Sequence, residues 1–361
     1  MTPTATSSAG ASTLAEQVSA LDPQPVAGTS INLEYGKRLM LFSGRANPAL
    51  AAKIAGKLNV DLGGVTLKTF SNGEVYCRYQ ESIRGADVFI VQPTCANPQE
   101  GVNPNDALME LMVMIDAAIG ASAHRVIAVT PWYGYSRQDK KSAPREPITA
   151  RLVARMLEAA GIDRLLTMDL HAGQVQGFFQ KPVDHMTALP FLSQYVGDQL
   201  GDPSDLCIIS PDAGRVKLTR KFAQMVGAPY ALLEKERPAQ QVAEIGYVIG
   251  ADKVKGRKAV IVDDMIDTGG TLAAGAQTVL DAGASEVYAV ATHGLFSGDA
   301  FNTLANSPLA GILVTDTVPL RDGAPELVRV LSCADILSDS VRRIFTDDSV
   351  SEIFAGENQL F

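Results

Sequence analysis

Cysteine is scarce in this sequence of 361 residues, and its four cysteines form no C-x-x-C pair. Cys77, Cys95, Cys207 and Cys333 lie far apart along the chain. This spacing excludes the usual zinc-binding patterns and disulfide frameworks, so we expect reduced, mostly buried thiols. The sequence also has no apolar run near the ~20 residues that cross a bilayer, which predicts that no membrane is a partner.

Positive charge is in the minority, with 31 lysines and arginines against 40 aspartates and glutamates and a net charge of −9. This balance argues against nucleic acid as a partner. The N-terminus lacks the basic start and apolar centre of a secretory signal, which predicts a cytoplasmic protein. The G-x-x-x-x-G-K-[ST] loop of P-loop phosphoryl-transfer enzymes does not occur either.

Residues 1–36 have little to bury, because they are rich in alanine, serine, threonine and proline without a sustained hydrophobic period. This composition predicts a disordered extension. From Arg38 onward strand and helix patterns alternate, which favours an α/β fold with largely parallel sheets. The pattern of 39–58 recurs at 207–226, and that of 87–129 recurs from 260 to 290, which suggests two copies of one α/β unit.

A loop with three carboxylates, two glycines and two threonines follows the apolar strand at 260–262. A helix-forming segment comes next, so we expect the loop at the carboxyl edge of a sheet, where α/β proteins bind ligands. The glycines let the backbone approach a ligand, and the threonines and the free N–H groups of the first helical turn suit a phosphate. The loop residues are Asp263, Asp264, Asp267, Thr268, Gly269, Gly270 and Thr271.

Asp263 and Asp264 would repel a phosphate, but they suit sugar hydroxyls or a divalent cation. A site for a phosphate, a polyol and a metal points to a sugar phosphate. The alternative is an ordinary strand-to-helix turn with solvated acids. The stretch resembles the signature loop of proteins that make or use phosphoribosyl pyrophosphate, and by itself it does not separate the makers from transferases that consume this compound.

A basic cluster occupies residues 131–151, on a proline-interrupted segment that predicts an irregular loop. Trp132, Tyr133 and Tyr135 lie beside the cations, a combination that suits a polyphosphate with a stacked base. A solvated, mobile loop is the alternative. The cations are Arg137, Lys140, Lys141, Arg145 and Arg151.

Further polar residues follow other predicted strands, and each has two interpretations. His171 could bind a metal or a phosphate, although a single histidine is more often structural. Asp212 could hold Mg²⁺ or cap a turn. Lys235 and Arg237 alternate onto one face of a strand end, where they could neutralise a transferring phosphoryl group or form an exposed charge run.

Several segments occur together in the order and at the spacing of one family, and they read SRQDKK…REPITA, MDLHAGQVQGFF, SPDAG, EKERP, VDDMIDTGGT and THGLFSG. From about Arg38 to Phe354 the chain resembles ribose-phosphate pyrophosphokinase, or phosphoribosyl pyrophosphate synthetase, of the phosphate-activated class. The resemblance implies two tandem phosphoribosyltransferase-like domains, each with a mostly parallel sheet flanked by helices. They would span 37–185, with the ATP loops, and 186–361, with the ribose 5-phosphate loop. The apolar helical pattern after Ala334 is expected to pack back on a domain, such as the first, or on a neighbouring subunit.

The resemblance also implies an enzyme that transfers the β,γ-pyrophosphoryl group of ATP to the C1 hydroxyl of ribose 5-phosphate and releases AMP. Lys235 and Arg237 would be catalytic, and Mg²⁺ would be the cofactor, with His171 and Asp212 at its site. The implied ATP-binding residues are Asn72, Gly73, Glu74, Arg137 and Gln138. The implied ribose 5-phosphate-binding residues are Arg237, Asp263, Asp264, Asp267, Thr268, Gly269, Gly270 and Thr271.

Members of this family act as ring-like homo-oligomers, commonly hexamers, with ATP sites completed across a subunit boundary. Phosphate and ADP are their effectors, and Ser349, Ser351 and Phe354 resemble the terminal segment near that regulatory site. The chain departs from the pattern at Arg215, where the family usually has a glycine, and in a longer segment at 97–105. Two other functions stay open: a non-catalytic regulatory homologue of the synthetase, and a phosphoribosyltransferase.

Overall fold

The computed structural model describes residues 36–236 and 245–354 of the chain. The predicted disordered extension, residues 1–36, therefore lies outside the described residues except for Gly36. Within the described ranges, no helix combines the length and the apolar character that crossing a membrane requires.

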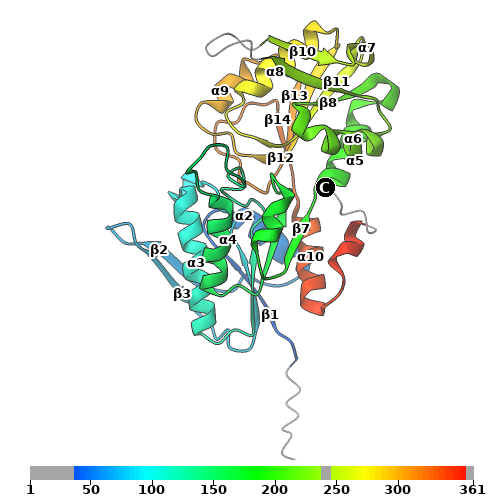
Figure 1. The fold of residues 1–361 in the computed structure, drawn as a ribbon. Coiled ribbons are helices and arrows are strands. Elements are labelled where there is room, and N and C mark those ends of the chain that lie inside the picture. The colour runs from blue at the N-terminus through cyan, green and yellow to red at the C-terminus, as the bar shows by residue number, and fades with distance from the viewer. Residues whose placement is uncertain (1–35, 237–244, 355–361) are drawn as a thin grey trace, which may run out of the picture. The chain divides into compact units, whose positions relative to one another are not determined.

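The first half of the chain forms a five-stranded sheet in which all neighbouring strands are parallel (Figure 1). The strand order is β1-β4-β5-β6-β7. These strands are β1 (Leu39–Ser43), β4 (Asp87–Val91), β5 (Arg125–Val129), β6 (Arg164–Met168) and β7 (Val183–Met186). The helices are α2 (Pro48–Leu58), α3 (Pro104–Gly120) and α4 (Thr149–Ala160), with short 3₁₀ turns η1 (Pro98–Glu100) and η2 (Gly173–Phe178).

The second half forms a seven-stranded sheet in the order β10-β9-β8-β11-β12-β13-β14, which is parallel except for the β9–β10 pair. Its strands are β8 (Leu206–Ser210), β9 (Tyr230–Glu236), β10 (Ile245–Ile249), β11 (Lys258–Ile266), β12 (Glu286–Gly294), β13 (Gly311–Thr315) and β14 (Val328–Leu331). Its helices are α5 (Leu189–Leu200), α6 (Val216–Val226), α7 (Ala251–Val254), α8 (Gly270–Asp281), α9 (Ala300–Ala305) and α10 (Ala334–Thr346), with 3₁₀ turns η3 (Pro203–Asp205), η4 (Ala213–Arg215) and η5 (Val350–Phe354).

The two sheets repeat one topology, as the sequence pattern predicts. The order β1-β4-β5-β6-β7 corresponds strand by strand to β8-β11-β12-β13-β14. In both halves the first strand is followed by a helix, α2 or α6, and the second by a helix, α3 or α8. The α/β fold prediction is confirmed. The domain boundary near residue 185 stays a prediction, because residues 38–361 form one compact unit by their contacts.

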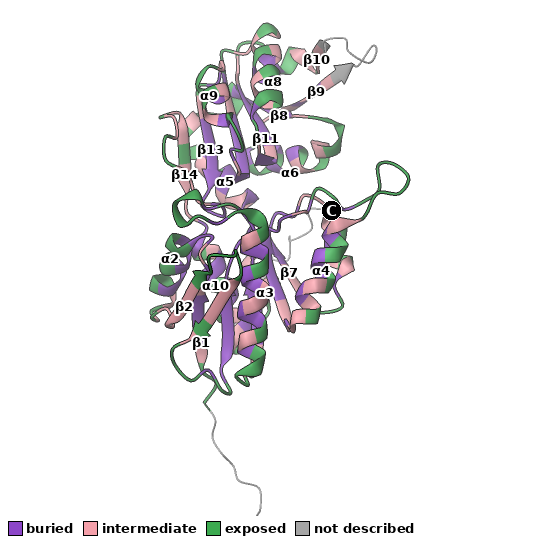
Figure 2. Ribbon diagram, turned by 90° about the vertical axis from the view of Figure 1, so that its left-hand side faces the viewer, coloured by how far each residue is buried: buried purple, intermediate pink, exposed green. Residues whose placement is uncertain are grey.

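Buried apolar strands explain why both sheets form. Every residue of β4 and β8 is buried, and β11 is buried over most of its length (Figure 2). Strands that are covered by helices on both faces read as continuous runs of valine and isoleucine rather than as alternating patterns. The carboxyl ends of these parallel strands meet at one edge of each sheet, which positions the loops that follow them.

The hairpin of β2 (Val65–Thr69) and β3 (Val75–Tyr79) and the helix α10 are not part of the repeated topology. The antiparallel hairpin forms a separate two-stranded sheet that projects from the rest of the first half (Figure 1). The last helix, α10, follows the second sheet in the chain and packs on α2. Lys57 of α2 pairs with Asp335 of α10 at 2.6 Å, and apolar residues of both helices belong to one buried cluster.

Candidate active site

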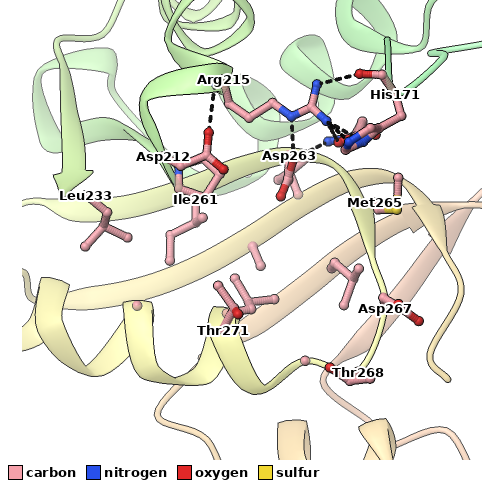
Figure 3. A pocket seen from close by; sticks show the side chains of 18 of the residues that line it. His171, Asp212, Arg215, Leu233, Ile261, Asp263, Met265, Asp267, Thr268 and Thr271 are labelled. Atoms are coloured by element: carbon pink, nitrogen blue, oxygen red, sulfur yellow. Dashed lines mark hydrogen bonds and ion pairs between the residues drawn. The ribbon is translucent and has the colours of Figure 1, made fainter. Parts of the chain in front are cut away.

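A cavity of about 240 Å³ lies at the carboxyl end of β11 (Figure 3). Its wall combines the loop after β11, the start of α8, the loop after β8, and side chains from the loops after β5 and β6. It therefore brings together residues that are as much as 153 positions apart (Arg137 to Val290). The predicted site residues that line it are Arg137, His171, Asp212, Asp263, Asp264, Asp267, Thr268, Gly269 and Thr271.

The two adjacent carboxylates at the end of β11 lie in different environments. The Asp264 side chain is 2% exposed, whereas that of Asp263 is 32% exposed. Both are bound by Arg215: Nε lies 3.1 Å from Asp263 Oδ1, and Nη2 lies 2.7 Å from Asp264 Oδ1. One guanidinium group thus spans both acids, which its planar fork permits.

His171 joins the same network from the loop after β6. Its Nδ1 lies 2.9 Å from Asp264 Oδ2 and 2.5 Å from Arg215 Nη2 (Figure 3). Arg215 Nη1 also donates to the His171 carbonyl oxygen at 3.1 Å. The histidine is therefore tied to Asp264 through its ring and to Arg215 through its ring and its backbone.

The acid pair ionises unequally. Burial and the neighbouring Asp264 carboxylate raise the pKa of Asp263 well above its usual range. Burial by itself also raises the pKa of Asp264, but the hydrogen bond from His171 and the charge of Arg215 outweigh it and bring that pKa below its usual range. Two close carboxylates that differ in this way hold their negative charge mainly on one member.

The glycine-rich loop has the geometry of an anion site. Gly269 is the N-cap of α8 and adopts a left-handed backbone conformation with φ 79°. Helix α8 has 12 residues, and its first N–H groups have no partner within the helix, so they are donors at a positive helix end. Backbone hydrogen bonds tie the THGLFSG segment to this loop. The amides of Leu295 and Ser297 donate to the carbonyls of Ile266 and Asp267 at 2.9 and 3.1 Å.

Arg137 reaches the glycine-rich loop from the first half of the chain. Its Nη1 lies 2.6 Å from Asp267 Oδ2. A second cavity of about 300 Å³ shares Arg137 and Asp267 with the first, and Gln138 also lines it. The basic loop and the glycine-rich loop are thus adjacent, as two halves of one site would require.

Two stretches of the chain match models of known protein families. Residues 39–161 match the N-terminal domain of ribose phosphate pyrophosphokinase, and residues 219–355 match the phosphoribosyl synthetase-associated domain. The ribose-phosphate pyrophosphokinase of Clostridium acetobutylicum is 45% identical over 326 residues, which cover 90% of this chain and 100% of the relative. That of Caldanaerobacter subterraneus is 47% identical over 322 residues, 89% and 99% of the two chains.

The chain belongs to the ribose-phosphate pyrophosphokinase family. A solved phosphoribosylpyrophosphate synthetase from Mycobacterium smegmatis has a TM-score of 0.80 and 42% identity, and it covers 86% of this chain and 100% of that one. The predictions of this family and of an enzyme are confirmed. Nothing in these likenesses favours a phosphoribosyltransferase or a regulatory homologue.

The three aromatic residues of the basic loop lie in different settings. Trp132 and Tyr133 are buried: the Trp132 ring packs against His293 at 4.8 Å between centroids, and the Tyr133 ring against Phe179 at 5.9 Å. Trp132 and the half-buried Tyr135 both line the second cavity. Tyr133 lines neither of the two cavities and is not available to stack on a base.

The other histidines have structural settings. His293 is fully buried, and its Nδ1 lies 2.8 Å from the Thr317 hydroxyl. Leu170 N donates to His185 Nε2 at 2.8 Å. Burial lowers the pKa of both rings, to about 4 for His185. His124 pairs with Asp87 at 2.7 Å, well away from the glycine-rich loop in sequence.

Several predicted site residues lie elsewhere or beyond what the structure describes. Asn72, Gly73 and Glu74 form the exposed turn between β2 and β3, and they do not line the described cavity wall. The backbone of Lys235 belongs to β9, beside the lining residue Leu233, but its side chain lies outside the described part. Arg237 also lies outside it.

The predicted regulatory residues are near the C-terminus, after α10. Ser349 and Ser351 are exposed, and their hydroxyl oxygens lie 2.8 Å apart. The backbone of Phe354 ends η5, and its side chain lies outside the described residues. Gly270, the remaining loop residue, is the first residue of α8.

Arg215 is the site residue that the sequence did not reveal. It stood out only as a departure from the family pattern. Its position is set by Asp212, whose Oδ1 accepts the Arg215 N–H at 3.1 Å and so caps the turn that leads into α6. A cation at the start of a helix that follows a buried strand was the available signal, but only the tertiary structure shows what it faces.

Proposed function

We propose that this chain synthesises 5-phosphoribosyl 1-pyrophosphate from ribose 5-phosphate and ATP, with release of AMP. The observation that carries the proposal is the single cavity in which the acid pair of β11, the N-terminus of α8 and Arg137 converge. These three features suit sugar hydroxyls, a phosphate monoester and a polyphosphate. Membership of the ribose-phosphate pyrophosphokinase family supports the same reaction.

In this proposal the glycine-rich loop holds ribose 5-phosphate. The amides of the first turn of α8 and the hydroxyls of Thr268 and Thr271 donate to the 5-phosphate. Asp263 and Asp264 accept hydrogen bonds from ribose hydroxyls. This arrangement fixes the C1 hydroxyl, whose oxygen bonds to the β-phosphorus of ATP as the bond from that phosphorus to the α,β-bridging oxygen breaks.

ATP binds beside this loop and contacts Arg137 and Gln138. The hairpin turn with Asn72, Gly73 and Glu74 contributes to the ATP site of a neighbouring subunit, since it projects away from the rest of its own first half (Figure 1). Lys235 and Arg237 provide positive charge as negative charge shifts during transfer. A cytoplasmic homo-oligomer, commonly a hexamer in this family, is part of the proposal.

A divalent cation fits this site as a partner of the substrate. Among the described residues no group of three or more histidine, cysteine, aspartate or glutamate side chains forms a ready metal cage. Mg²⁺ does not need such a cage, because it usually binds one or two protein oxygens and takes its other ligands from waters or substrate phosphates. Asp212, which is exposed at the cavity wall, and His171 would hold it, and it would screen the phosphate charge during transfer.

Regulation by phosphate and ADP completes the proposal. Ser349, Ser351 and Phe354 are its candidate contacts, by their likeness to the terminal segment of the family. Support from the described residues is limited to the exposed hydroxyls of the two serines.

The identity of the nucleotide product tests this function. The protein is incubated with ATP, Mg²⁺ and ribose 5-phosphate, and the products are separated by anion-exchange chromatography. We expect AMP and phosphoribosyl pyrophosphate in equal amounts. Stoichiometric ADP would contradict the proposal, and the absence of any product would favour the regulatory homologue. A phosphoribosyltransferase would instead consume added phosphoribosyl pyrophosphate in the presence of a nucleobase.

The turnover of Lys235→Ala in the same assay tests whether Lys235 is catalytic. We expect a loss of turnover of roughly 10²-fold or more, the usual weight of a preformed positive group at a transition state. Lys217→Ala removes an exposed lysine of α6 and is the matched control. Unchanged turnover in Lys235→Ala would remove this residue from the mechanism.

A further inference from the structure

Arg215 occupies the centre of the candidate site although no part of the proposed reaction assigns it a role. Its side chain is 16% exposed, and all three guanidinium nitrogens have partners in the site. Nε contacts Asp263, Nη1 contacts the His171 carbonyl, and Nη2 contacts both the His171 ring and Asp264. An arginine that is committed to this extent within the protein is not poised to leave for a substrate.

The position of Nη2 resembles that of a bound cation. It lies 2.5 Å from His171 Nδ1 and 2.7 Å from Asp264 Oδ1, and the Nε of the same group lies 3.1 Å from Asp263 Oδ1. The guanidinium thus contacts an imidazole nitrogen and two carboxylate oxygens, which are atoms of the kind that bind a divalent metal. The described residues hold no group of three such side chains ready to bind a metal, and the positive charge beside these three belongs to the chain.

The charges of the cavity explain why a fixed cation is needed there. The described lining carries four aspartates, at positions 212, 263, 264 and 267, against two arginines, at 137 and 215. A pocket that receives a sugar phosphate must not repel it. Without Arg215 the acid pair would keep its charge uncompensated, take up protons, or recruit a cation from solution.

We propose that Arg215 is the built-in cation of this site, which positions His171, Asp263 and Asp264 and neutralises the acid pair, where a divalent cation other than the Mg²⁺ of the substrate would otherwise bind. Arg215 acts as a positioning residue, because it touches the residues that meet the substrate and not the reacting atoms. The inference rests on the proposed function only for the identity of the anion that the pocket receives. Its consequence for metal binding does not depend on turnover.

Metal binding in the absence of substrate tests the proposal directly. Mn²⁺ binding is measured by electron paramagnetic resonance on the full chain, as wild type and as Arg215→Met. We expect Arg215→Met to bind one Mn²⁺ on the order of tenfold more tightly than the corresponding site of the wild type, or to gain a site. Adding Asp263→Asn to this variant should abolish the gain. Equal Mn²⁺ binding in wild type and Arg215→Met would overturn the proposal.

Two variants control for charge and for folding. Lys217→Met removes an exposed cation of α6 two residues away and should leave Mn²⁺ binding unchanged. Arg215→Lys keeps the charge but cannot span both acids and the His171 carbonyl, so its Mn²⁺ affinity should lie between those of wild type and Arg215→Met. Thermal melts of each variant establish that the fold is intact, and if Arg215→Met does not fold, the test rests on Arg215→Lys. An Arg215→Lys affinity equal to that of the wild type would then count against the proposal.

Calorimetry with ribose 5-phosphate extends the test to the substrate. Without divalent cations, Arg215→Met should bind ribose 5-phosphate on the order of tenfold more weakly than wild type, and Mg²⁺ should restore much of this loss. Unchanged metal-free affinity in Arg215→Met would contradict a positioning role. If the Mn²⁺ result holds while wild type binds no ribose 5-phosphate, the proposed function fails and the role of Arg215 as built-in cation stands.

Discussion

Gly269 and Gly270 are adjacent in the chain, but only Gly269 is constrained by its backbone conformation and by a close neighbour. The φ of 79° at Gly269 is a conformation that other residues rarely adopt, and a Cβ there would lie 2.8 Å from Leu304 Cγ. A Cβ on Gly270 would meet nothing within 4 Å. The fold therefore requires the first glycine, whereas open space surrounds the second.

Alanine substitution at the two positions should separate folding from binding. We expect Gly269→Ala to lower the free energy of unfolding by about 1–3 kcal/mol, from backbone strain and the clash with Leu304. Gly270→Ala should change it by less than about 1 kcal/mol but raise the Michaelis constant for ribose 5-phosphate, because a methyl group then lies at the mouth of the helix N-terminus. Denaturant unfolding and steady-state kinetics give both values. Equal stabilities of the two variants would contradict this account.

A single buried carboxylate, Asp87, joins the starts of two strands. Its side chain is 1% exposed, and it pairs with Arg125 and with His124. Burial by itself raises the pKa of Asp87, but the hydrogen bonds from Arg125 and His124 outweigh it, and the net direction is down. Because the folded-state pKa is the lower one, the carboxylate stabilises the fold above its unfolded pKa of about 3.9 and loses this contribution as the pH falls further.

Asp87→Asn should therefore have a pH-dependent cost. We expect the variant to unfold more easily than wild type by about 1.5–3 kcal/mol at neutral pH, the range for hydrogen bonds to charged groups. The difference should stay constant down to about pH 5 and shrink below about pH 4, as the wild-type carboxylate protonates. Urea unfolding across this pH range measures it, with the exposed Asp116→Asn as control. A difference that grows on acidification would refute the sign.

At the scale of elements, the site depends on two loops that meet across the chain. The loop between β5 and α4 carries Arg137, and the loop between β11 and α8 carries Asp267. Their side chains are 56% and 29% exposed, so solvent screens this ion pair and it stabilises the fold little. Its significance is positional, because it connects the proposed ATP and ribose 5-phosphate sites.

Breaking this pair should change substrate binding and leave the fold nearly unaffected. We expect Arg137→Met and Asp267→Ala each to cost less than about 1 kcal/mol of stability. Arg137→Met should mainly raise the Michaelis constant for ATP, and Asp267→Ala that for ribose 5-phosphate. Lys217→Met, which removes an exposed cation of α6 that has no proposed role in binding, is the control. Normal ribose 5-phosphate binding by Asp267→Ala in calorimetry would show that the loop is wrongly assigned.

At the scale of the whole molecule, the chain returns to its first half after completing the second sheet. Helix α10 follows β14 in sequence yet packs on α2. Its buried face includes Leu337 and Val341, both with no exposed surface, and beyond its end Asp347 pairs with Arg125 at 2.9 Å. The C-terminal helix thus contributes to the stability of the region that carries β1 and α2.

Leu337→Ala should destabilise the whole chain. We expect a loss of about 2–5 kcal/mol, the usual cost of a cavity at a fully buried leucine. Asp339→Ala, on the exposed face of the same helix, should cost less than about 1 kcal/mol. Guanidinium unfolding followed by circular dichroism compares the two. A loss below about 1 kcal/mol in Leu337→Ala would mean that α10 is not part of the buried core.

Local sequence determined the repeated α/β pattern, the glycine-rich loop and the family. A buried strand, a turn and a helix are encoded within some 20 neighbouring residues, because hydrophobic periodicity and glycine conformation are local properties. The start of α8 agrees with the pattern, whereas β11 continues to Ile266, so Asp263 and Asp264 belong to the strand and not to the loop. The same local reasoning failed for Tyr133, whose burial depends on Phe179 much further along the chain.

Only the tertiary structure decided what Arg215 does. Its three nitrogens meet acids and a histidine that lie 44 to 49 positions away, at the ends of β11 and β6. No spacing in the sequence encodes that meeting, because it arises where parallel strands bring their carboxyl ends to one edge. The pairing of α10 with α2 is of the same kind, since a helical pattern shows that one face must be buried but not which surface covers it.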